Sequence, residues 1–318
     1  MKNNLKGSIM LAIATVIWGT AFVFQEEAAK YIGSFTLNCL RSVVGAVVLI
    51  PVALIMKNIR QKKTGTPEKL LTKSSIIGGI CCGVALAVAA NLQQIGIVLN
   101  ADLAAGDSGK AGFITAMYII FVPVVAVFGG KRLRFSIVAA VIIGVLGLYF
   151  ISVKNGFTIA TGDILLFLCA IAFTGHIMVI DHFSQKADGV TLSLIQFVTA
   201  AVISGVLMFA FDQKTLSVSN IASAAVPILF CGVMSSGVAY TLQIIGQKYS
   251  EATVASLIMS LESLFAMVAA CIFYTKLPTA REGIGCLLML IAIFVVETPF
   301  ADRLFAKIFK KSKQENVV

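Results

Sequence analysis

Ten long runs of apolar residues follow one another along the chain, and this pattern restricts its fold more than any other feature. A helix needs roughly 20 apolar residues to cross the hydrocarbon core of a membrane. The runs have about that length and cover residues 7–24, 35–56, 76–99, 110–128, 135–153, 162–181, 192–211, 223–247, 253–274 and 281–298. Charged residues make up 13% of the chain, against about 25% in soluble globular proteins. The sequence therefore predicts an all-α integral membrane protein with ten transmembrane helices and excludes an ordinary soluble enzyme.

The segments between the runs are short, and the longest, at about residues 57–75, is basic and polar. None is long enough to fold as a separate soluble domain. The seven cysteines all lie within apolar runs, which argues against a disulfide framework. His176 and His182 are the only histidines, and no cysteines or carboxylates accompany them at metal-ligand spacing. We therefore expect neither a metal ion nor another cofactor.

Lysine and arginine are distributed unevenly between the two sides of the predicted bundle. If the N-terminus is cytoplasmic, 18 of the 25 basic residues fall on the cytoplasmic side. Because cytoplasmic loops carry the excess of Lys and Arg, we expect both termini in the cytoplasm and the protein in the plasma membrane, which in a bacterium is the inner membrane. This distribution explains the net charge of +10 without binding to nucleic acid. The basic segment 301–318 is expected to form a cytoplasmic tail on anionic lipids.

The two halves of the sequence match each other. VAANLQQIGI at 88–97 and VAYTLQIIGQ at 238–247 are identical at six of ten positions. Further matches in the same order place Thr36 opposite Thr191, Arg41 opposite Gln196 and Trp18 opposite Phe173. We therefore predict a first five-helix repeat over residues 1–153 and a second over 154–300. Five is an odd number, so the second repeat enters the membrane inverted, as is typical of secondary transporters that work by alternating access.

Away from the ends of the runs, two side chains are charged in their ordinary state, Glu262 in the ninth run and Arg41 about six residues from the outer end of the second. Such a residue is unfavourable in the membrane unless it faces protein, water or a partner. Glu262 is either a proton or substrate site, since burial favours the neutral form of a carboxyl, or a structural residue bonded to neighbouring helices. Arg41 either extends toward the surface as an anchor or pairs with Glu26 or Glu27, or it contacts an anionic substrate.

Uncharged polar and aromatic residues in the runs form a second candidate set. Asn91 and Gln94 are three residues apart, as are Tyr240 and Gln243, so each pair shares one helix face. The predicted substrate-binding residues are Trp18, Asn91, Gln93, Gln94, Tyr118, His176, Tyr240 and Gln243. The alternatives are hydrogen bonding between helices and, for Trp18, a place in the interfacial aromatic belt.

Several short motifs carry a family resemblance. They are Trp18-Gly19, Leu40-Arg41, GFITAMYIIFVPVVAVFGGKRLR at 112–134 and SLES at 260–263. In this order they resemble the EamA-type members of the drug/metabolite transporter superfamily, over roughly residues 5–298. The chain departs from the family pattern where Ser263 replaces a proline and where Lys131 and Lys276 occupy regions that often hold a glutamate. The resemblance implies a ten-helix transporter that moves small polar metabolites such as amino acids, often outward.

An integral-membrane enzyme acting on a lipid-like substrate is the alternative function. Such an enzyme needs clustered acid, base or metal-binding groups, whereas the acids here are scattered one or two to a loop. We therefore expect a transporter and no enzyme. The expected partners are a small-molecule substrate and the lipid bilayer, with protons as the coupling ion if Glu262 titrates. The sequence is compatible with a monomer or a homodimer.

Overall fold

The computed structural model describes residues 2–298 apart from 66, 68, 102–107, 131–133, 153–159 and 276. The predicted tail at 301–318 lies outside the described residues, as do Lys131, Lys154 and Lys276. Within the described residues the chain is helical and has no strand, which confirms the all-α prediction. The helices are α1 (Lys2–Ala29), α2 (Ser34–Thr64), α3 (Lys73–Ala101), α4 (Ser108–Thr115), α5 (Tyr118–Phe128), α6 (Phe135–Ser152), α7 (Thr161–Phe183), α8 (Gly189–Phe211), α9 (Val218–Ser223), α10 (Ala225–Leu229), the π-helix η1 (Phe230–Ala239), α11 (Tyr240–Gln247), α12 (Ala252–Met259), α13 (Glu262–Phe273) and α14 (Ala280–Glu297).

Eight helical stretches in the described part of the chain are long and apolar enough to cross a membrane. They are α1, α2, α3, α4 with α5, α7, α8, α10 with η1 and α11, and α12 with α13. The fifth and tenth predicted runs are helical too, as α6 and α14. The apolar part of α6 is shorter, at Phe135–Ile151, and α14 carries Arg281, Glu282 and Glu297.

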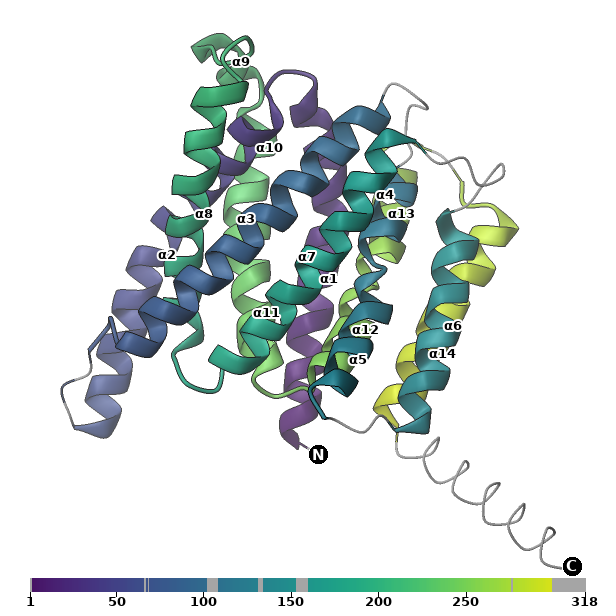
Figure 1. Ribbon diagram of the computed structural model, residues 1–318, viewed down its shortest axis with the longest axis horizontal. Coiled ribbons are helices and arrows are strands. Elements are labelled where there is room, and N and C mark those ends of the chain that lie inside the picture. Colours follow the sequence, from purple (N-terminus) through teal and green to yellow (C-terminus); the bar gives the residue numbers. More distant parts are fainter. Residues whose placement is uncertain are drawn as a thin grey trace, which may run out of the picture.

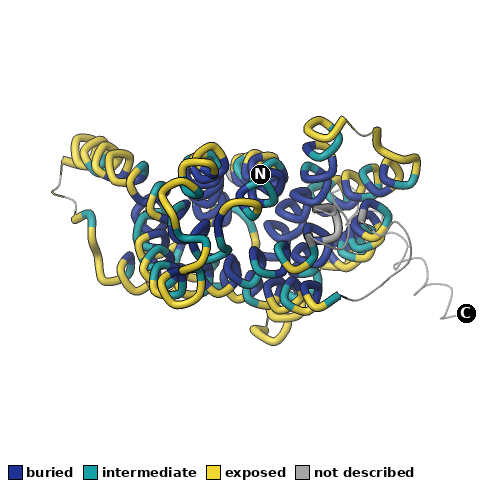
Figure 2. Tube along the Cα trace, turned by 90° about the horizontal axis from the view of Figure 1, so that it is seen from above, coloured by how far each residue is buried: buried dark blue, intermediate teal, exposed yellow. Residues whose placement is uncertain are grey.

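The helices lie side by side as a bundle, with α2 and α8 at one edge and α6 and α14 at the other (Figure 1). Seen from above, buried residues occupy the inside and exposed residues the periphery (Figure 2). The peripheral side chains of the helices include many large apolar ones, such as Val202, Val206 and Phe209 on α8. Apolar side chains on the outside are what a bundle in contact with lipid requires.

Several helices extend beyond the expected runs, and the largest difference is at the end of α2. The second run was expected to end at residue 56, but α2 continues to Thr64. Lys, Arg and Gln, which fill this stretch, are good helix formers. The helix ends where Gly65 adopts a left-handed conformation with φ of 69° and donates its N–H to the Gln61 carbonyl. The basic segment after the second run is therefore partly helical.

Antiparallel pairs of helices join the two halves of the chain. At one end of the α2–α8 pair Asp212 accepts hydrogen bonds from Thr36, and at the other end Arg60 pairs with Asp188. At one end of the α3–α7 pair Asn100 donates to Asp163 over 2.9 Å. These contacts fix which end of each helix meets which end of its neighbour.

The start of α2 is capped by a residue distant in sequence. The N-cap position holds Gly33, which has no side chain to cap the helix. Asp212 Oδ2 instead accepts from the Thr36 backbone N–H (2.7 Å) and the Thr36 hydroxyl (2.9 Å). A Cβ atom at Gly33 would lie 2.2 Å from Asp212 Cγ, so the carboxylate fills the place of the missing cap. The end of α8 therefore holds the beginning of α2 in place.

Candidate functional site

Two of the expected spans are interrupted near their middle. The span of α4 and α5 is broken by a turn at Ala116 and Met117, and the span of α12 and α13 by a turn at Ser260 and Leu261. In each turn a backbone N–H bonds three residues back, from Met117 to Ile114 (3.2 Å) and from Leu261 to Ile258 (3.1 Å). Such tight turns within helices are frequent at functional sites.

The two interruptions meet. Tyr118 is the first residue of α5 and Glu262 is the first residue of α13. The Tyr118 hydroxyl donates a hydrogen bond of 2.9 Å to Glu262 Oε1, and both side chains are buried. A carboxylate at a helix N-terminus is also favoured by the helix dipole. The sequence places Glu262 in an apolar run, and the helix break gives that carboxyl polar surroundings.

A cavity of about 460 Å³, which counts space open to solvent, lies beside this pair. Seven of the predicted site residues line it, and they are Trp18, Arg41, Gln93, Tyr118, Tyr240, Gln243 and Glu262. The other lining residues are Phe22, Gln25, Phe173, Ile177, Ser235 and Met259. The lining draws on helices from both halves of the chain.

Aromatic rings form one wall of the cavity. The ring centroids of Trp18 and Tyr240 are 4.8 Å apart in an edge-to-face arrangement. Tyr240 also contacts Phe197, and the Tyr118 ring lies 6.5 Å from Phe173. Because Trp18 is buried in this wall, it does not take part in an interfacial aromatic belt. Edge-to-face contacts of this kind fix ring orientation.

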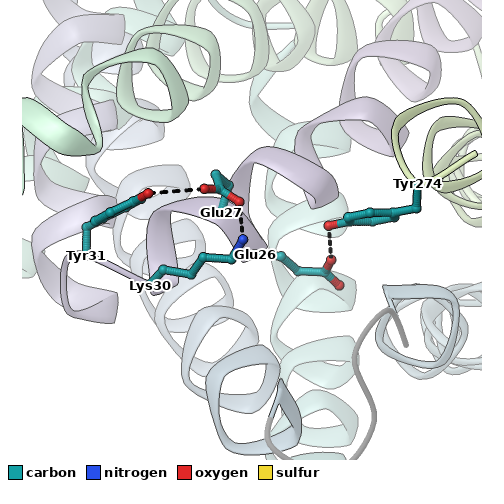
Figure 3. Close-up of polar contacts among 5 residues, drawn as sticks. All are labelled: Glu26, Glu27, Lys30, Tyr31 and Tyr274. Atoms are coloured by element: carbon teal, nitrogen blue, oxygen red, sulfur yellow. Dashed lines mark hydrogen bonds and ion pairs between the residues drawn. The ribbon is translucent and has the colours of Figure 1, made fainter.

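Arg41 is buried and faces the cavity. Its Nη1 donates to Gln25 Oε1 over 3.3 Å, and no ion pair to a described carboxylate is formed. The expected pairing with Glu26 or Glu27 is therefore wrong, as is the expectation of a side chain that extends to the surface. Figure 3 shows where those carboxylates go: Glu27 binds Lys30 and Tyr31, and Glu26 accepts from Tyr274. The guanidinium is thus left available on the cavity side.

Three predicted site residues do not line the cavity. Asn91 bridges three helices, since it accepts from Asn38 of α2 (2.9 Å) and donates to Ser204 of α8 (3.0 Å). Gln94 donates to the backbone carbonyl of Gln25. The alternative of hydrogen bonding between helices describes both residues.

His176 also lies outside the lining. Its Nε2 is 2.9 Å from Gln196 Oε1, and its ring lies 6.0 Å from that of Tyr240. The histidine therefore supports the aromatic wall from behind. Among the residues that the structure describes, no group of three or more His, Cys, Asp or Glu side chains could hold a metal ion.

Gln25 is the main lining residue that sequence reasoning missed. It follows the predicted end of the first run at residue 24, so it was not considered as part of a span. A signal was nevertheless present, because Trp18, Phe22 and Gln25 are spaced i, i+4 and i+7 and share one helix face.

Comparisons with known proteins agree with this architecture. The chain is 25% identical over 299 residues to an uncharacterized transporter of Archaeoglobus fulgidus, covering 92% of this chain and 86% of that protein. A second uncharacterized transporter of the same organism is 23% identical over 295 residues, covering 92% and 99%. A solved crystal structure superimposes with a TM-score of 0.73 at 18% identity, covering 94% of this chain and 98% of the other, which shows a shared fold. The sequence also matches the EamA-like transporter family over residues 5–153 and again over 160–298. The chain belongs to the EamA-like transporter family, and it is a multi-pass membrane protein of the transporter class.

Proposed function

We propose that the protein is a secondary active transporter that exports small polar metabolites, such as amino acids, across the plasma membrane by alternating access. Family membership supports transport, and the cavity supports a small polar cargo. In this proposal ten helices cross the membrane as two inverted repeats, residues 1–153 and 154–300. The uneven distribution of Lys and Arg supports cytoplasmic termini.

Equivalent contacts in the two halves support the repeat. Asn38 and Asn91 are hydrogen-bonded over 2.9 Å between α2 and α3. A shift of 150–155 positions, which follows from the sequence matches, converts them to Ser193 and Thr241, and these residues are hydrogen-bonded over 2.8 Å between α8 and α11. Two distant pairs at matching positions make the same contact, as expected of duplicated units.

The direction of the helices supports inversion. Gln94 near the end of α3 bonds to Gln25 near the end of α1, and Asn100 at the end of α3 bonds to Asp163 at the start of α7. The first helix of the second half thus begins on the side where the first helix of the first half ends. Repeats with opposite directions can expose a shared cavity to either side at similar energy.

The meeting of the two interrupted helices carries the proposal. Tyr118 and Glu262 come from the fourth helices of the two halves and bond to each other beside the cavity. Discontinuous helices at a midplane site are a recurring feature of secondary transporters. In this mechanism Glu262 takes up a proton from one side and releases it to the other as the halves rock, which couples cargo movement to the proton gradient.

A reconstitution experiment tests the function. Liposomes containing the full-length protein are loaded with a panel of labelled amino acids, and release is followed with the outside acidic, alkaline or at equal pH. We expect protein-dependent release that changes with the pH gradient. Protein-free liposomes provide the baseline. An absence of protein-dependent flux for the whole panel would refute the proposed cargo class.

A further inference from the structure

We infer that the cargo is a zwitterion with an apolar side chain, whose carboxylate binds Arg41 and whose ammonium group binds Glu262. This inference rests on the proposed function and assigns the cavity's substrate class. It follows from the carboxylate of Glu262 and from three further features of the lining: an uncompensated cation, two polar atoms without partners, and an apolar wall.

Arg41 is the first feature. A guanidinium carries five N–H donors and keeps its charge in proteins. Here the side chain is 4% exposed and, among the described residues, makes one hydrogen bond, to the neutral Gln25 amide. A buried charge is strongly unfavourable without an opposite charge and hydrogen bonds. The described part of the chain supplies no carboxylate within ion-pairing distance, so a carboxylate from the cargo would complete the site.

The second feature is a pair of buried polar atoms on the same cavity. Trp18 Nε1 is a donor and Gln243 Oε1 is an acceptor, and neither has a hydrogen-bond partner among the described residues. Both side chains are more than nine-tenths buried and line the cavity. Native proteins satisfy nearly all buried polar groups. A ligand with both an acceptor and an N–H donor would satisfy these two atoms.

Glu262 provides the opposite charge. It is the carboxylate that lines the cavity, and the Tyr118 hydroxyl occupies its Oε1. Its other oxygen makes no hydrogen bond within the described residues and can accept one from an ammonium group. Arg41 and Glu262 do not pair with each other, so the cavity presents a cation and an anion at separate places on its wall.

The third feature is the apolar remainder of the lining. Phe22, Phe173, Ile177 and Met259 join the aromatic wall. A charged side chain on the cargo would lie against these residues without a partner. An apolar side chain would lose water-exposed surface there, which favours binding. The lining thus selects a neutral amino-acid-like zwitterion over a basic or acidic one.

The chain's single tryptophan makes the test direct. Trp18 is the only tryptophan in the sequence, so tryptophan fluorescence reports on the cavity alone. The full-length protein in detergent micelles, which add no tryptophan, is titrated with three matched probes: L-leucine, 3-methylbutylamine, which lacks the carboxylate, and 4-methylpentanoate, which lacks the amino group. We expect saturable binding of leucine, with each of the other probes weaker by about tenfold or more.

Two variants test whether the carboxylate of the cargo binds Arg41. Arg41→Gln is expected to weaken leucine binding by about tenfold or more while leaving the amine within about twofold. Lys62→Gln removes the same charge from an exposed position on the same helix and is expected to bind like the parent protein. Leucine binding no tighter than that of the amine, unchanged leucine binding by Arg41→Gln, or no response to any probe would overturn the inference. The probe comparison on the parent protein decides the matter even if Arg41→Gln does not fold.

The liposome assay separates this inference from the proposed function. A protein that binds leucine but gives no flux supports the cargo assignment and contradicts transport. A protein that gives flux of other molecules but shows no preference for leucine over its two analogues supports transport and contradicts the cargo assignment.

Discussion

Gly96 of α3 and Gly162 of α7 meet with their backbones in contact, so that a Cβ atom on Gly162 would lie 2.5 Å from the Gly96 carbonyl oxygen. Gly7 of α1 and Gly246 of α11 meet in the same way, with a Cβ on Gly7 2.8 Å from the Gly246 carbonyl oxygen. Small residues let helix backbones approach closely in a membrane. Both contacts join the two halves of the chain, and therefore they set how closely the halves pack.

Gly162→Ala is expected to destabilise the protein. The added methyl group meets backbone atoms, which cannot rotate away, and overpacking of this kind costs about 1–3 kcal/mol. The thermal unfolding temperature of the purified protein should fall. Gly175→Ala is the control on the same helix, because a Cβ there meets nothing within 4 Å. That variant should keep or raise the unfolding temperature, since alanine favours a helix by about 0.5–1 kcal/mol over glycine. Equal effects of the two substitutions would contradict the close contact.

Glu262→Gln is expected to abolish the response of transport to the pH gradient. Coupling between two ligands of about 1–3 kcal/mol corresponds to roughly 5- to 150-fold in affinity, and the amide cannot exchange a proton. Flux is measured in liposomes over a range of pH. The titratable groups around Glu262 are Tyr118, Tyr240 and Cys169, which ordinarily are uncharged near neutral pH.

The matched control for this prediction is Glu251→Gln. Glu251 is an exposed carboxylate directly before α12, and its side chain makes no capping hydrogen bond. The control should keep the pH response of the parent protein. A Glu262→Gln protein with the same pH profile as the parent would leave Glu262 a structural residue.

The membrane-spanning helices could be predicted from the sequence because a polar backbone can adopt few conformations in the hydrocarbon core of a membrane. Every backbone group in the hydrocarbon must be paired internally, so a long apolar run has to be helical. Polar residues such as Gln93 and Gln243 stand out against that background, and both line the cavity. The helix breaks at Met117 and Leu261 were not predictable in this way, since neither turn contains glycine or proline. They depend on contacts between two helices far apart in the sequence.

The sequence also does not predict which neighbouring helix a polar helix face contacts. Asn91 and Gln94 share a helix face, yet Asn91 bonds to α2 and α8 whereas Gln94 bonds to α1. The three-residue spacing predicts the common face, but only the packing of the bundle decides the partner. Gln25 was missed for a related reason: the helix extends past the apolar run, to Ala29. Hydropathy marks the apolar core of a span and not its polar ends.

Asp212→Ala is expected to loosen the start of α2. Loss of an N-cap side chain costs about 0.5–2 kcal/mol, and here the cap comes from α8. Hydrogen exchange should accelerate at the backbone amide of Thr36, which donates to Asp212, and the unfolding temperature should fall.

A swap of the cap tests this directly. Gly33→Asp alone should be destabilising, because its Cβ would meet the Asp212 carboxylate. Combining Gly33→Asp with Asp212→Gly places the cap on α2 itself, as Asp188 already caps α8. The double variant should recover most of the stability lost by either single variant. Additive losses would show that Asp212 does not act as the cap.

Tyr274→Phe is expected to ease opening of the cavity at one end without changing its pH response. The Tyr274 hydroxyl donates to Glu26 Oε2 over 3.2 Å and links the end of α13 to the end of α1 (Figure 3). In the proposed alternating-access mechanism, opening on that side would separate the two helix ends and break the bond, which at an exposed site contributes about 0.5–1.5 kcal/mol or less. Initial transport rates should therefore change by no more than about tenfold.

The pH range over which the hydrogen bond between Tyr274 and Glu26 persists distinguishes the effect of Tyr274→Phe from that of Glu262→Gln. Tyr274 follows the membrane-spanning part of α13, and burial, followed by the nearby carboxylates, raises the pKa of its hydroxyl to about 12. Because the pKa of Tyr274 is higher in the folded protein than in the unfolded chain, the hydrogen bond to Glu26 is fully present below about pH 10, the pKa of tyrosine in the unfolded chain. The bond is lost only as the pH rises through the pKa of Tyr274 in the folded protein. Between pH 5 and about 9 the bond therefore stays intact, and Tyr274→Phe should shift the rate equally at every pH. If Tyr274→Phe instead changed the shape of the pH profile, the proton response would have to include this end of the bundle and could not be assigned to Glu262 alone.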